Sequence, residues 1–333
     1  PMEKKKEVSW GIIGCGDVTE KKSGPAFYKL PGSRLEAVMR RDRERAADYA
    51  RRHHVPKFYD DASALIADPD VTAIYVATPP RNHCEYAIES MLAGKPVYVE
   101  KPMGLAYDEC RRMLEVSEKT GVQLHVAYYR RSMPYFRKVA ELLELGTVGS
   151  LSGICLEFIV PPRPEDLDRG HLPWRLHRDV SGGGYLQDMG SHQINILQYL
   201  FGKITGIRSV AQNRAGLYDA EDYVAAIFSF ESGVTATCLW NFAAGPQEHR
   251  DRVEIFGTKG TIRFSVFDMD RIEVAVEIGT DTIVIPHEEH VQMPHIAHIN
   301  EAILENRYDP AWTLEAVETT RIIDQILHTN ETY

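Results

Sequence analysis

The sequence predicts two domains of different classes: an N-terminal α/β domain with a doubly wound parallel sheet, and a C-terminal α+β domain with a large, mostly antiparallel open sheet. Up to about residue 127, apolar segments alternate with amphipathic segments, which is the pattern of parallel strands connected by helices. Beyond residue 150 the apolar segments follow one another across short turns, as in hairpins. A chain of 333 residues is long enough for two such domains. We therefore predict domains at residues 1–127 and 128–333.

Five apolar segments of the first domain are predicted to be buried strands, and three amphipathic segments are predicted to be helices. The strands are residues 8–13, 34–39, 71–78, 96–100 and 122–128, and the helices are residues 42–54, 82–94 and 107–121. Asp42 is suited to cap the first of these helices, and Gly94 and Gly121 are suited to end the other two. In the second domain, turns at Ser232–Gly233 and Gly257–Gly260 predict two hairpins. Helices are expected there near residues 187–200, 292–305 and 312–328.

The charge and cysteine content exclude several classes of protein. The formal net charge is −10, and no cluster of Lys or Arg follows the short run Lys4–Lys6, so neither a nucleic acid nor an anionic membrane is an expected partner. No segment is long and apolar enough to cross a bilayer, and the start PMEKKKEVSW does not form a signal peptide. The five cysteines have neither CxxC nor metal-ligand spacing, which indicates reduced thiols and a cytoplasmic protein.

A glycine-rich turn, in the stretch GIIGCGDVT, follows the first predicted strand. Gly14 and Gly16 match a dinucleotide-binding fingerprint, in which the first glycine permits a tight turn and the second lets the backbone approach a pyrophosphate. Because the turn opens a βαβ series, it predicts a Rossmann nucleotide-binding domain; the alternative is a glycine-rich turn without a ligand. The cofactor contacts predicted here are Gly14, Cys15, Gly16, Asp17 and Val18. Thr19 stands where a third Gly or Ala is usual, and Gly24–Pro25 should interrupt the first helix.

The end of the second strand predicts which dinucleotide is bound. NAD enzymes place an acid there against the ribose 2′-hydroxyl, but Glu36 lies at the wrong end of this strand and Asp42 is used as a helix cap. Arg40 and Arg41 stand at the expected position instead, and guanidinium groups bind a 2′-phosphate with paired hydrogen bonds. We therefore favour NADP, with NAD possible. The alternative is that both arginines are solvated surface charges.

Two further strands end in unusual residues. One ends in Thr78-Pro79-Pro80 and the other in Glu100-Lys101-Pro102. In a doubly wound sheet, ligands bind outside the carboxyl ends of the strands. Lys101 is therefore a candidate active-site cation close to the nicotinamide, although a lone lysine at a strand end is more often part of a surface ion pair.

Taken together, several stretches resemble the glucose–fructose oxidoreductase/inositol dehydrogenase (Gfo/Idh/MocA) family. They are GIIGCGDV, ATPPRNHCEYAIESMLAGKPVYVEKPM, AYYRRSMP, SGGGYLQDMGSHQINILQYLFG and VEIFGTKGTI, and they cover nearly the whole chain. The resemblance implies an NAD(P)-dependent oxidoreductase that transfers a hydride between nicotinamide and a C–OH/C=O centre of a sugar, polyol or related ring. It also implies a homodimer or homotetramer that pairs through the C-terminal sheet.

The resemblance also implies roles for individual residues. The catalytic residues implied are Lys101, Asp188 and His192. The cofactor contacts implied beyond the glycine turn and the arginines are Thr78, Pro79, Asn82, His83, Glu100 and Lys101. The substrate residues implied are Tyr128, Arg130, Trp174 and Arg175. The last two lie in PPRPEDLDRGHLPWR, which is similar to a segment of NADP-dependent 1,5-anhydrofructose reductases and sugar dehydrogenases. No metal is implied.

The residues themselves support Asp188 and His192. The two are four positions apart, so on a helix they share one face, and an imidazole titrates near neutrality. The alternative is a capped or salt-bridged helix face. Gly182–Gly184 precede this helix and are expected to give a flexible entry to it. Asn195 stands where the family often has a second acid, which leaves the substrate open.

Three other interpretations compete with this one. Tyr199 and Lys203 have the spacing of a short-chain dehydrogenase pair, but Gly202 ends the helix between them, so we treat the match as accidental. His287, His290, His295 and His298 match no metal motif, and prolines break the segment. A non-catalytic NAD(P)-binding sensor of the same fold is the alternative to an enzyme. Within the enzyme hypothesis, either His192 or Lys101 carries the proton.

Overall fold

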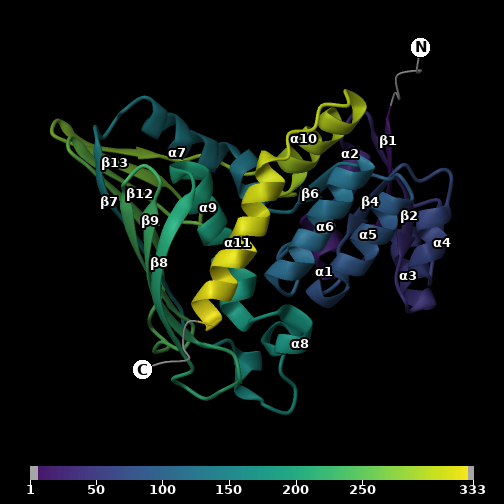
Figure 1. Ribbon diagram of the computed structural model, residues 1–333, viewed down its shortest axis with the longest axis horizontal. Helices are drawn as coiled ribbons and strands as arrows, with labels where there is room; N and C mark the ends of the chain where they lie inside the picture. Colours follow the sequence, from purple (N-terminus) through teal and green to yellow (C-terminus); the bar gives the residue numbers. More distant parts are fainter. Residues whose placement is uncertain (1–6, 329–333) are drawn as a thin grey trace. The chain divides into compact units, whose positions relative to one another are not determined.

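In the computed structural model, which describes residues 7–328, the chain forms two compact units (Figure 1). Within the described residues, the first unit comprises residues 7–133 and 288–318, and the second comprises residues 134–287 and 319–328. The run Lys4–Lys6 lies outside the described residues. The first crossing between the units, after Met133, is close to the predicted boundary after residue 127. Residues 288–318 differ from the prediction, which placed them in the second domain.

The first unit contains a six-stranded sheet in which every neighbouring pair is parallel. The strands are β1 Val8–Ile13, β2 Ser33–Met39, β3 Lys57–Tyr59, β4 Ala73–Val76, β5 Val97–Val99 and β6 Leu124–Val126. Their order is β3-β2-β1-β4-β5-β6, which is the order of a doubly wound dinucleotide-binding sheet. All residues of β1, β4, β5 and β6 are buried, as expected for strands covered on both faces. The predicted Rossmann sheet is confirmed.

Helices cover both faces of this sheet and form a separate core on each. The helices are α1 Asp17–Lys21, α2 Gly24–Lys29, α3 Arg43–Arg52, α4 Ala62–Ala67, α5 His83–Leu92 and α6 Tyr107–Thr120. Ile13 belongs to one core, with Leu65 of α4, and Ile12 belongs to the other, with Phe27 of α2 and Tyr49 of α3. Adjacent residues of β1 thus serve opposite cores, because successive side chains of a strand point to opposite faces.

Several local signals in the sequence are confirmed. The first helix is interrupted, and α2 restarts it at Gly24 with Pro25 in its first turn. The Asp42 carboxylate caps α3 by accepting a hydrogen bond from the Arg45 backbone N–H at 3.1 Å. Gly121 ends α6 in the left-handed region, with φ +68°. The prediction missed β3, because its three residues are half-exposed and only pairing with β2 makes them a strand.

One helix from late in the chain belongs to the first unit. Ile296 and Ile299 of α10, Met293–Leu304, join the same core as Ile12. The buried Trp10 indole N–H of β1 donates to the Asn300 side-chain oxygen at 2.8 Å. The apolar periodicity of this segment predicts a helix with a buried face. It carries no information on which sheet covers that face, and for this reason the predicted second domain was too long.

The second unit contains an eight-stranded sheet in which all but one of the pairs are antiparallel. The strands are β7 Leu151–Ile159, β8 Ile204–Gln212, β9 Tyr223–Phe230, β10 Thr235–Asn241, β11 Arg250–Gly257, β12 Gly260–Phe264, β13 Ile272–Val276 and β14 Gly279–Ile283. Their order is β14-β13-β12-β11-β7-β10-β9-β8. Both predicted hairpins are present, β9–β10 and β11–β12. The predicted α+β class of this part is therefore confirmed.

Helices α7 Pro134–Glu144, α8 Arg178–Ser181 and α9 Ser191–Phe201 belong to the second unit, and α11 Ala311–His328 begins in the first unit and ends in the second. Buried and more exposed residues alternate along β9, β10 and β11, as expected for a sheet with one face in a core. No helix within residues 7–328 is long and apolar enough to cross a membrane.

The outer face of this sheet, the side away from the core, is partly charged. The Arg252 guanidinium lies 2.7 Å from the Glu157 carboxylate, and the Arg263 guanidinium lies 2.6 Å from the Glu254 carboxylate. Apolar side chains of the same face include Ile227, which is 45 % exposed. Ion pairs across three adjacent strands thus stand beside exposed apolar side chains.

Candidate active site

The glycine turn after β1 has the geometry that a dinucleotide needs. Gly14 has φ +92°, and a Cβ there would lie 2.8 Å from the Thr78 methyl carbon. Only glycine fits this position. At Gly16 an added Cβ would meet only the Gly14 carbonyl oxygen, at 4.0 Å, so that side of the turn is open. A pyrophosphate that approaches the backbone needs this open space, and the residues present therefore fit an NAD(P) cofactor.

Thr19, which stands where a third Gly or Ala is usual, is bonded to the backbone of the glycine turn. Its hydroxyl donates to the Gly16 carbonyl at 2.7 Å, and the Tyr49 hydroxyl donates to the Thr19 carbonyl at 2.8 Å. A Cβ on Gly24 would lie 2.0 Å from that carbonyl oxygen. The close packing that a third glycine usually permits is thus found here at Gly24.

The structure places Arg40 and the glycine turn together at the end of β2. The Arg40 guanidinium donates to the Cys15 carbonyl at 3.4 Å, whereas Arg41 is exposed. Glu36 is buried in mid-strand, 3.3 Å from the Arg34 guanidinium, and therefore does not reach this edge. Burial raises the pKa of the Cys15 thiol to about 11, so this thiol is protonated at neutral pH.

The predicted residues at the ends of β4 and β5 lie on connected loops. Thr78 and Pro79 follow β4, a short 3-10 helix spans Pro80–Asn82, and α5 then begins at His83. The His83 ring is fully buried, with one nitrogen 2.7 Å from the Thr78 carbonyl oxygen and the other 2.9 Å from that of Pro102. The ring thus joins the loop that carries Thr78 to the loop that carries Lys101.

Lys101 itself is half-buried, and its peptide bond to Pro102 is cis. Its backbone N–H donates to the Glu100 carboxylate at 3.1 Å. That carboxylate also accepts hydrogen bonds from the Tyr75 hydroxyl at 2.6 Å and from the Gln292 amide at 2.7 Å. Glu100 is thus turned into the first unit, and its charge is held beside the backbone of Lys101. Sequence reasoning missed Tyr75 and Gln292, and no sequence signal marks them as partners.

In the second unit the structure brings three of the predicted residues together. The Arg175 guanidinium lies 3.1 Å from the Asp188 carboxylate and 4.5 Å from the centre of the Trp174 ring. Asp188 lies in a π-helical turn, Leu186–Gly190, that leads directly into α9. Such turns are frequent at functional sites, because the wider turn redirects the side chains it carries. His192 follows in the first turn of α9.

His192 is buried among packed residues of the second unit. Its ring meets that of Phe267 edge-on, with centroids 6.0 Å apart. The neighbouring Gln193 accepts a hydrogen bond from the Trp240 indole at 2.6 Å, which anchors α9 to β10. Asn195, which replaces the family's second acid, is also buried and donates to the Thr319 hydroxyl of α11 at 3.1 Å.

The glycines before this helix serve close packing. Gly182 and Gly184 have φ +93° and +65°, and a Cβ on Gly184 would lie 2.5 Å from the Ala220 methyl carbon. A Cβ on Gly183 would lie 2.7 Å from Leu327 of α11. The expected flexible entry is therefore a tightly packed segment, because any larger residue would collide with its neighbours.

The segment that carries Trp174 and Arg175 is anchored by a buried acid that sequence reasoning missed. Asp166 is fully buried, and its carboxylate accepts hydrogen bonds from the Tyr185 hydroxyl at 2.6 Å and from the Arg163 backbone at 2.8 Å. Burial and this carboxylate raise the pKa of Tyr185. The remaining predicted substrate residues, Tyr128 and Arg130, are buried in the first unit.

The histidines set aside as metal ligands are engaged with other groups. The rings of His290 and His295 contact the backbone carbonyls of Lys21 at 2.6 Å and of Val126 at 3.2 Å. No group of three or more His, Cys, Asp or Glu side chains suited to a metal ion occurs within residues 7–328.

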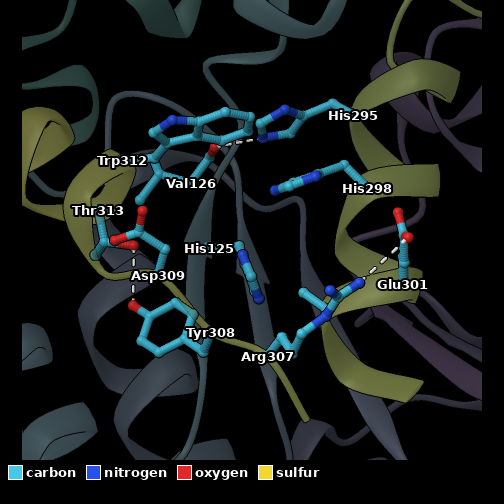
Figure 2. Close-up of a pocket in the computed structure, with 11 residues that line it drawn as sticks. His125, Val126, His295, His298, Glu301, Arg307, Tyr308, Asp309, Trp312 and Thr313 are labelled. Atoms are coloured by element: carbon cyan, nitrogen blue, oxygen red, sulfur yellow. Dashed lines mark hydrogen bonds and ion pairs between the residues drawn. The ribbon is translucent and has the colours of Figure 1, made fainter. Parts of the chain in front are cut away.

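A cavity of about 360 Å³ lies in the first unit, away from the glycine turn (Figure 2). It is lined by His125 and Val126 of β6, by α10 and by the start of α11, and none of the predicted site residues lines it. Figure 2 shows His125 in the middle of the lining side chains, and Trp312 stacks on His295 with centroids 5.6 Å apart. Burial lowers the pKa of both histidines to about 3.

Comparison with known proteins decides the family. Residues 8–128 match the model of the oxidoreductase family with an NAD-binding Rossmann fold, and residues 136–263 match that of the GFO/IDH/MocA C-terminal domain. The chain belongs to the Gfo/Idh/MocA family of oxidoreductases. Oxidoreductase P35 of Formosa agariphila is 36 % identical over 319 residues, covering 95 % of this chain and 97 % of that protein.

Solved structures of this family share the fold. Levoglucosan dehydrogenase in complex with NADH superposes with a TM-score of 0.86 at 22 % identity, over 97 % of this chain and 96 % of that one. A 3-ketoreductase from Actinomadura kijaniata, in complex with NADP and TDP-benzene, gives 0.82 at 23 % identity, over 96 % and 97 % of the chains. The predicted family and fold class are confirmed, and the chain is an NAD(P)-dependent oxidoreductase.

Proposed function

We propose that this protein is an NADP-preferring dehydrogenase or reductase that acts on a CH–OH group of a sugar, polyol or related ring. The observation that carries the cofactor preference is the Arg40 guanidinium, which lies against the glycine turn at the end of β2, where an NAD enzyme has an acid. The fixed fork of a guanidinium pairs with the two oxygens of a phosphate. The sugar-like substrate class rests on the family and on relatives such as levoglucosan dehydrogenase.

The residues of each unit have distinct proposed roles. A bound nicotinamide would accept or supply the hydride. In the second unit, His192 removes or returns the hydroxyl proton of the substrate, and Asp188 orients that imidazole or holds a neighbouring hydroxyl. In the first unit, Lys101 donates a hydrogen bond to the reacting oxygen and stabilises negative charge that develops there. The exchanged assignment, in which Lys101 carries the proton and His192 supports it, remains the competing version.

The proposed substrate residues belong to both units. Trp174 and Arg175 belong to the Asp188 cluster, and the aromatic face and the guanidinium suit a ring with hydroxyl groups. Tyr128 and Arg130 follow β6 and are proposed for the same substrate. The Asp188–Arg175 pair leaves this cluster with one charge of each sign.

A screen of sugars and polyols tests the proposal directly. The purified protein is mixed with each compound and with NADP or NAD, and the nicotinamide absorbance is followed in both directions. We expect turnover with at least one cyclic polyol or sugar, and a higher kcat/KM with NADP. Binding of NADP without turnover of any compound would instead support a sensor. Equal affinity for NADP and NAD would contradict the cofactor preference.

We further propose that the protein is a homodimer or homotetramer that pairs through the outer face of the eight-stranded sheet. Burial of exposed apolar side chains such as Ile227 in an interface is favourable. The ion pairs of Arg252 and Arg263 can set the register of two copies. Light scattering at micromolar concentration should show an oligomer, and Ile227→Lys should weaken it. Ile278→Lys is the control, because Ile278 is 97 % exposed at the β13–β14 turn. A monomeric parent protein would contradict the proposal.

We also propose a cytoplasmic location. All five cysteines are free, and four of them are buried, as is typical of proteins that keep reduced thiols. Fractionation of the source cells with antibody detection would test this, and recovery from the medium would contradict it.

A further inference from the structure

Each ring nitrogen of the fully buried His83 side chain faces a backbone carbonyl oxygen. One ring nitrogen lies 2.9 Å from the Pro102 carbonyl oxygen, and the other lies 2.7 Å from that of Thr78. A neutral imidazole carries only one N–H, and its second nitrogen is an acceptor. A neutral ring in this position would therefore direct a lone pair at a carbonyl oxygen at hydrogen-bond distance. Only the imidazolium, with two N–H groups, satisfies both carbonyls.

The two carbonyls belong to the loops that carry the predicted site. Thr78 follows β4 and touches the space beside Gly14, and Pro102 is the residue after Lys101. His83 opens α5, which packs against the same sheet. The rigid ring therefore bridges the loop that carries Thr78 and the loop that carries Lys101 and Pro102.

The surroundings of the ring have opposing effects on its pKa. Burial is the largest influence and lowers the pKa of His83 overall, while the backbone groups of Thr78, Pro102 and Met103 and the nearby Glu100 carboxylate act to raise it. The geometry, with a carbonyl oxygen at hydrogen-bond distance from each ring nitrogen, opposes the direction set by burial. Glu100 is itself buried and lies on the strand end that leads to Lys101. An imidazolium held by two carbonyls beside a buried carboxylate is compensated, whereas an isolated buried cation would not be.

We infer that His83 is a doubly protonated positioning residue, which clamps the Thr78 loop to the Lys101–Pro102 loop and so fixes the direction of the Lys101 ammonium. The inference rests on the proposed role of Lys101 only for its effect on turnover. The protonation state and the two hydrogen bonds stand on the geometry of the first unit alone. His83 then acts on the reaction through Lys101. It need not touch the cofactor, although the family resemblance implies such a contact.

The decisive experiment measures the ring directly. The unmodified protein is labelled with ¹⁵N-histidine, and the ring nitrogens are observed by long-range ¹H–¹⁵N correlation at pH 7. His83→Gln identifies the His83 signals by their disappearance. We expect both ring nitrogens of His83 to be protonated. The internal control is His125, which is also buried, has one ring nitrogen 3.0 Å from the Gln123 side-chain oxygen, and has a pKa that burial lowers to about 3. It should show one protonated and one bare nitrogen.

A kinetic comparison tests the positioning role. His83→Gln supplies donors from a single nitrogen, which cannot reach both carbonyls, so kcat should fall by about 10-fold or more with little change in KM. His125→Gln should retain kcat within about 2-fold, because small changes away from the site have small effects. A bare nitrogen on His83 at pH 7 would overturn the clamp. Two protonated nitrogens with unchanged kcat would overturn only its link to Lys101. A protein without turnover, but with the doubly protonated ring, would refute the proposed function and leave the clamp standing.

Discussion

The two units support their predicted reactive groups in different ways. In the first unit, the backbone of Lys101 is held by Glu100, whose buried carboxylate accepts hydrogen bonds from Tyr75 and Gln292. In the second unit, Asp188 lies beside Arg175, and the two side chains are 16 % and 39 % exposed. A buried polar network fixes the positions of its side chains, because a buried polar group that loses its hydrogen bond destabilises the fold. A half-exposed ion pair contributes charge more than position, because water competes for both partners.

The largest expected effect tests whether Lys101 and His192 both take part in the reaction. Lys101→Ala and His192→Ala should each lower kcat by about 10²–10⁴, the usual contribution of a positioned acid or base, while NADP affinity changes little. Lys203→Ala is the matched control, since it removes an exposed lysine from the Tyr199/Lys203 spacing that we regard as accidental. Steady-state kinetics on the substrate found by the screen provide the measurement. Near-normal kcat in both active-site variants would sink the assigned chemistry.

The next effect concerns the cofactor edge of the first unit. Replacing Arg40 and Arg41 together with alanine should raise the Kd for NADP by about tenfold or more and that for NAD far less, since bonds to a charged group contribute about 1.5–3 kcal/mol. Arg111→Ala with Arg112→Ala makes the same charge change at two adjacent exposed arginines of α6. Calorimetric titration measures the Kd values of the unmodified protein and of both double variants for NADP and NAD, six in all. A similar loss in the control pair would mean that net charge alone steers NADP.

The buried network around Glu100 should be sensitive to the replacement of one carboxylate oxygen. Glu100→Gln keeps one acceptor for Tyr75 and Gln292 but turns an amide N–H₂ toward the Lys101 backbone N–H. An unmet buried partner costs about 1–3 kcal/mol, so the free energy of unfolding should fall by that amount. Urea denaturation measures it, with Glu118→Gln on the exposed face of α6 as the control. Equal stability of the two variants would show that the network does not hold this strand end.

Buried histidines make the first unit sensitive to acid. Burial lowers the pKa of His125 and His295 to about 3, so the unfolded chain binds protons below its ordinary histidine pKa while the folded chain does not. The stability that the neutral rings contribute is thus present at neutral pH and is lost as the pH falls from about 6.5 toward 3. Within that window, each ring should change the free energy of unfolding by about 1.4 kcal/mol per pH unit. His125→Gln should flatten the pH dependence of urea denaturation, and an unchanged slope would contradict the assignment.

The smallest effect is expected at the ion pair of the second unit. Arg175→Gln should lower the free energy of unfolding by less than about 1 kcal/mol, because the pair is partly solvated. It should nevertheless raise KM, if Arg175 contacts the substrate as proposed. Thermal denaturation and kinetics separate the two outcomes, and Arg169→Gln, on an exposed pair with Asp219, is the control. A stability loss as large as that of Glu100→Gln would remove the contrast between the units.

Local features of this protein can be read from its amino-acid sequence alone. The buried runs of the parallel strands, the glycine at Gly14, the cap at Asp42 and the two hairpin turns follow from periodicity and backbone conformation. These signals lie within a few residues of one another, so a single segment carries the whole argument. Lys101, Asp188 and His192 are likewise candidates because short stretches around them resemble the family's motifs.

The distant residues that support Lys101, Asp188 and His192 are visible only in the folded chain. Gln292 reaches Glu100 across 192 positions of sequence, and Asn300 reaches Trp10 across 290. The apolar face of α10 predicts burial but is compatible with either sheet, so the periodicity could not assign the helix to the first unit. The two carbonyls that face His83 are likewise backbone groups, which carry no residue signature. Such contacts depend on how packed segments place their polar atoms, and that placement is a property of the folded chain as a whole.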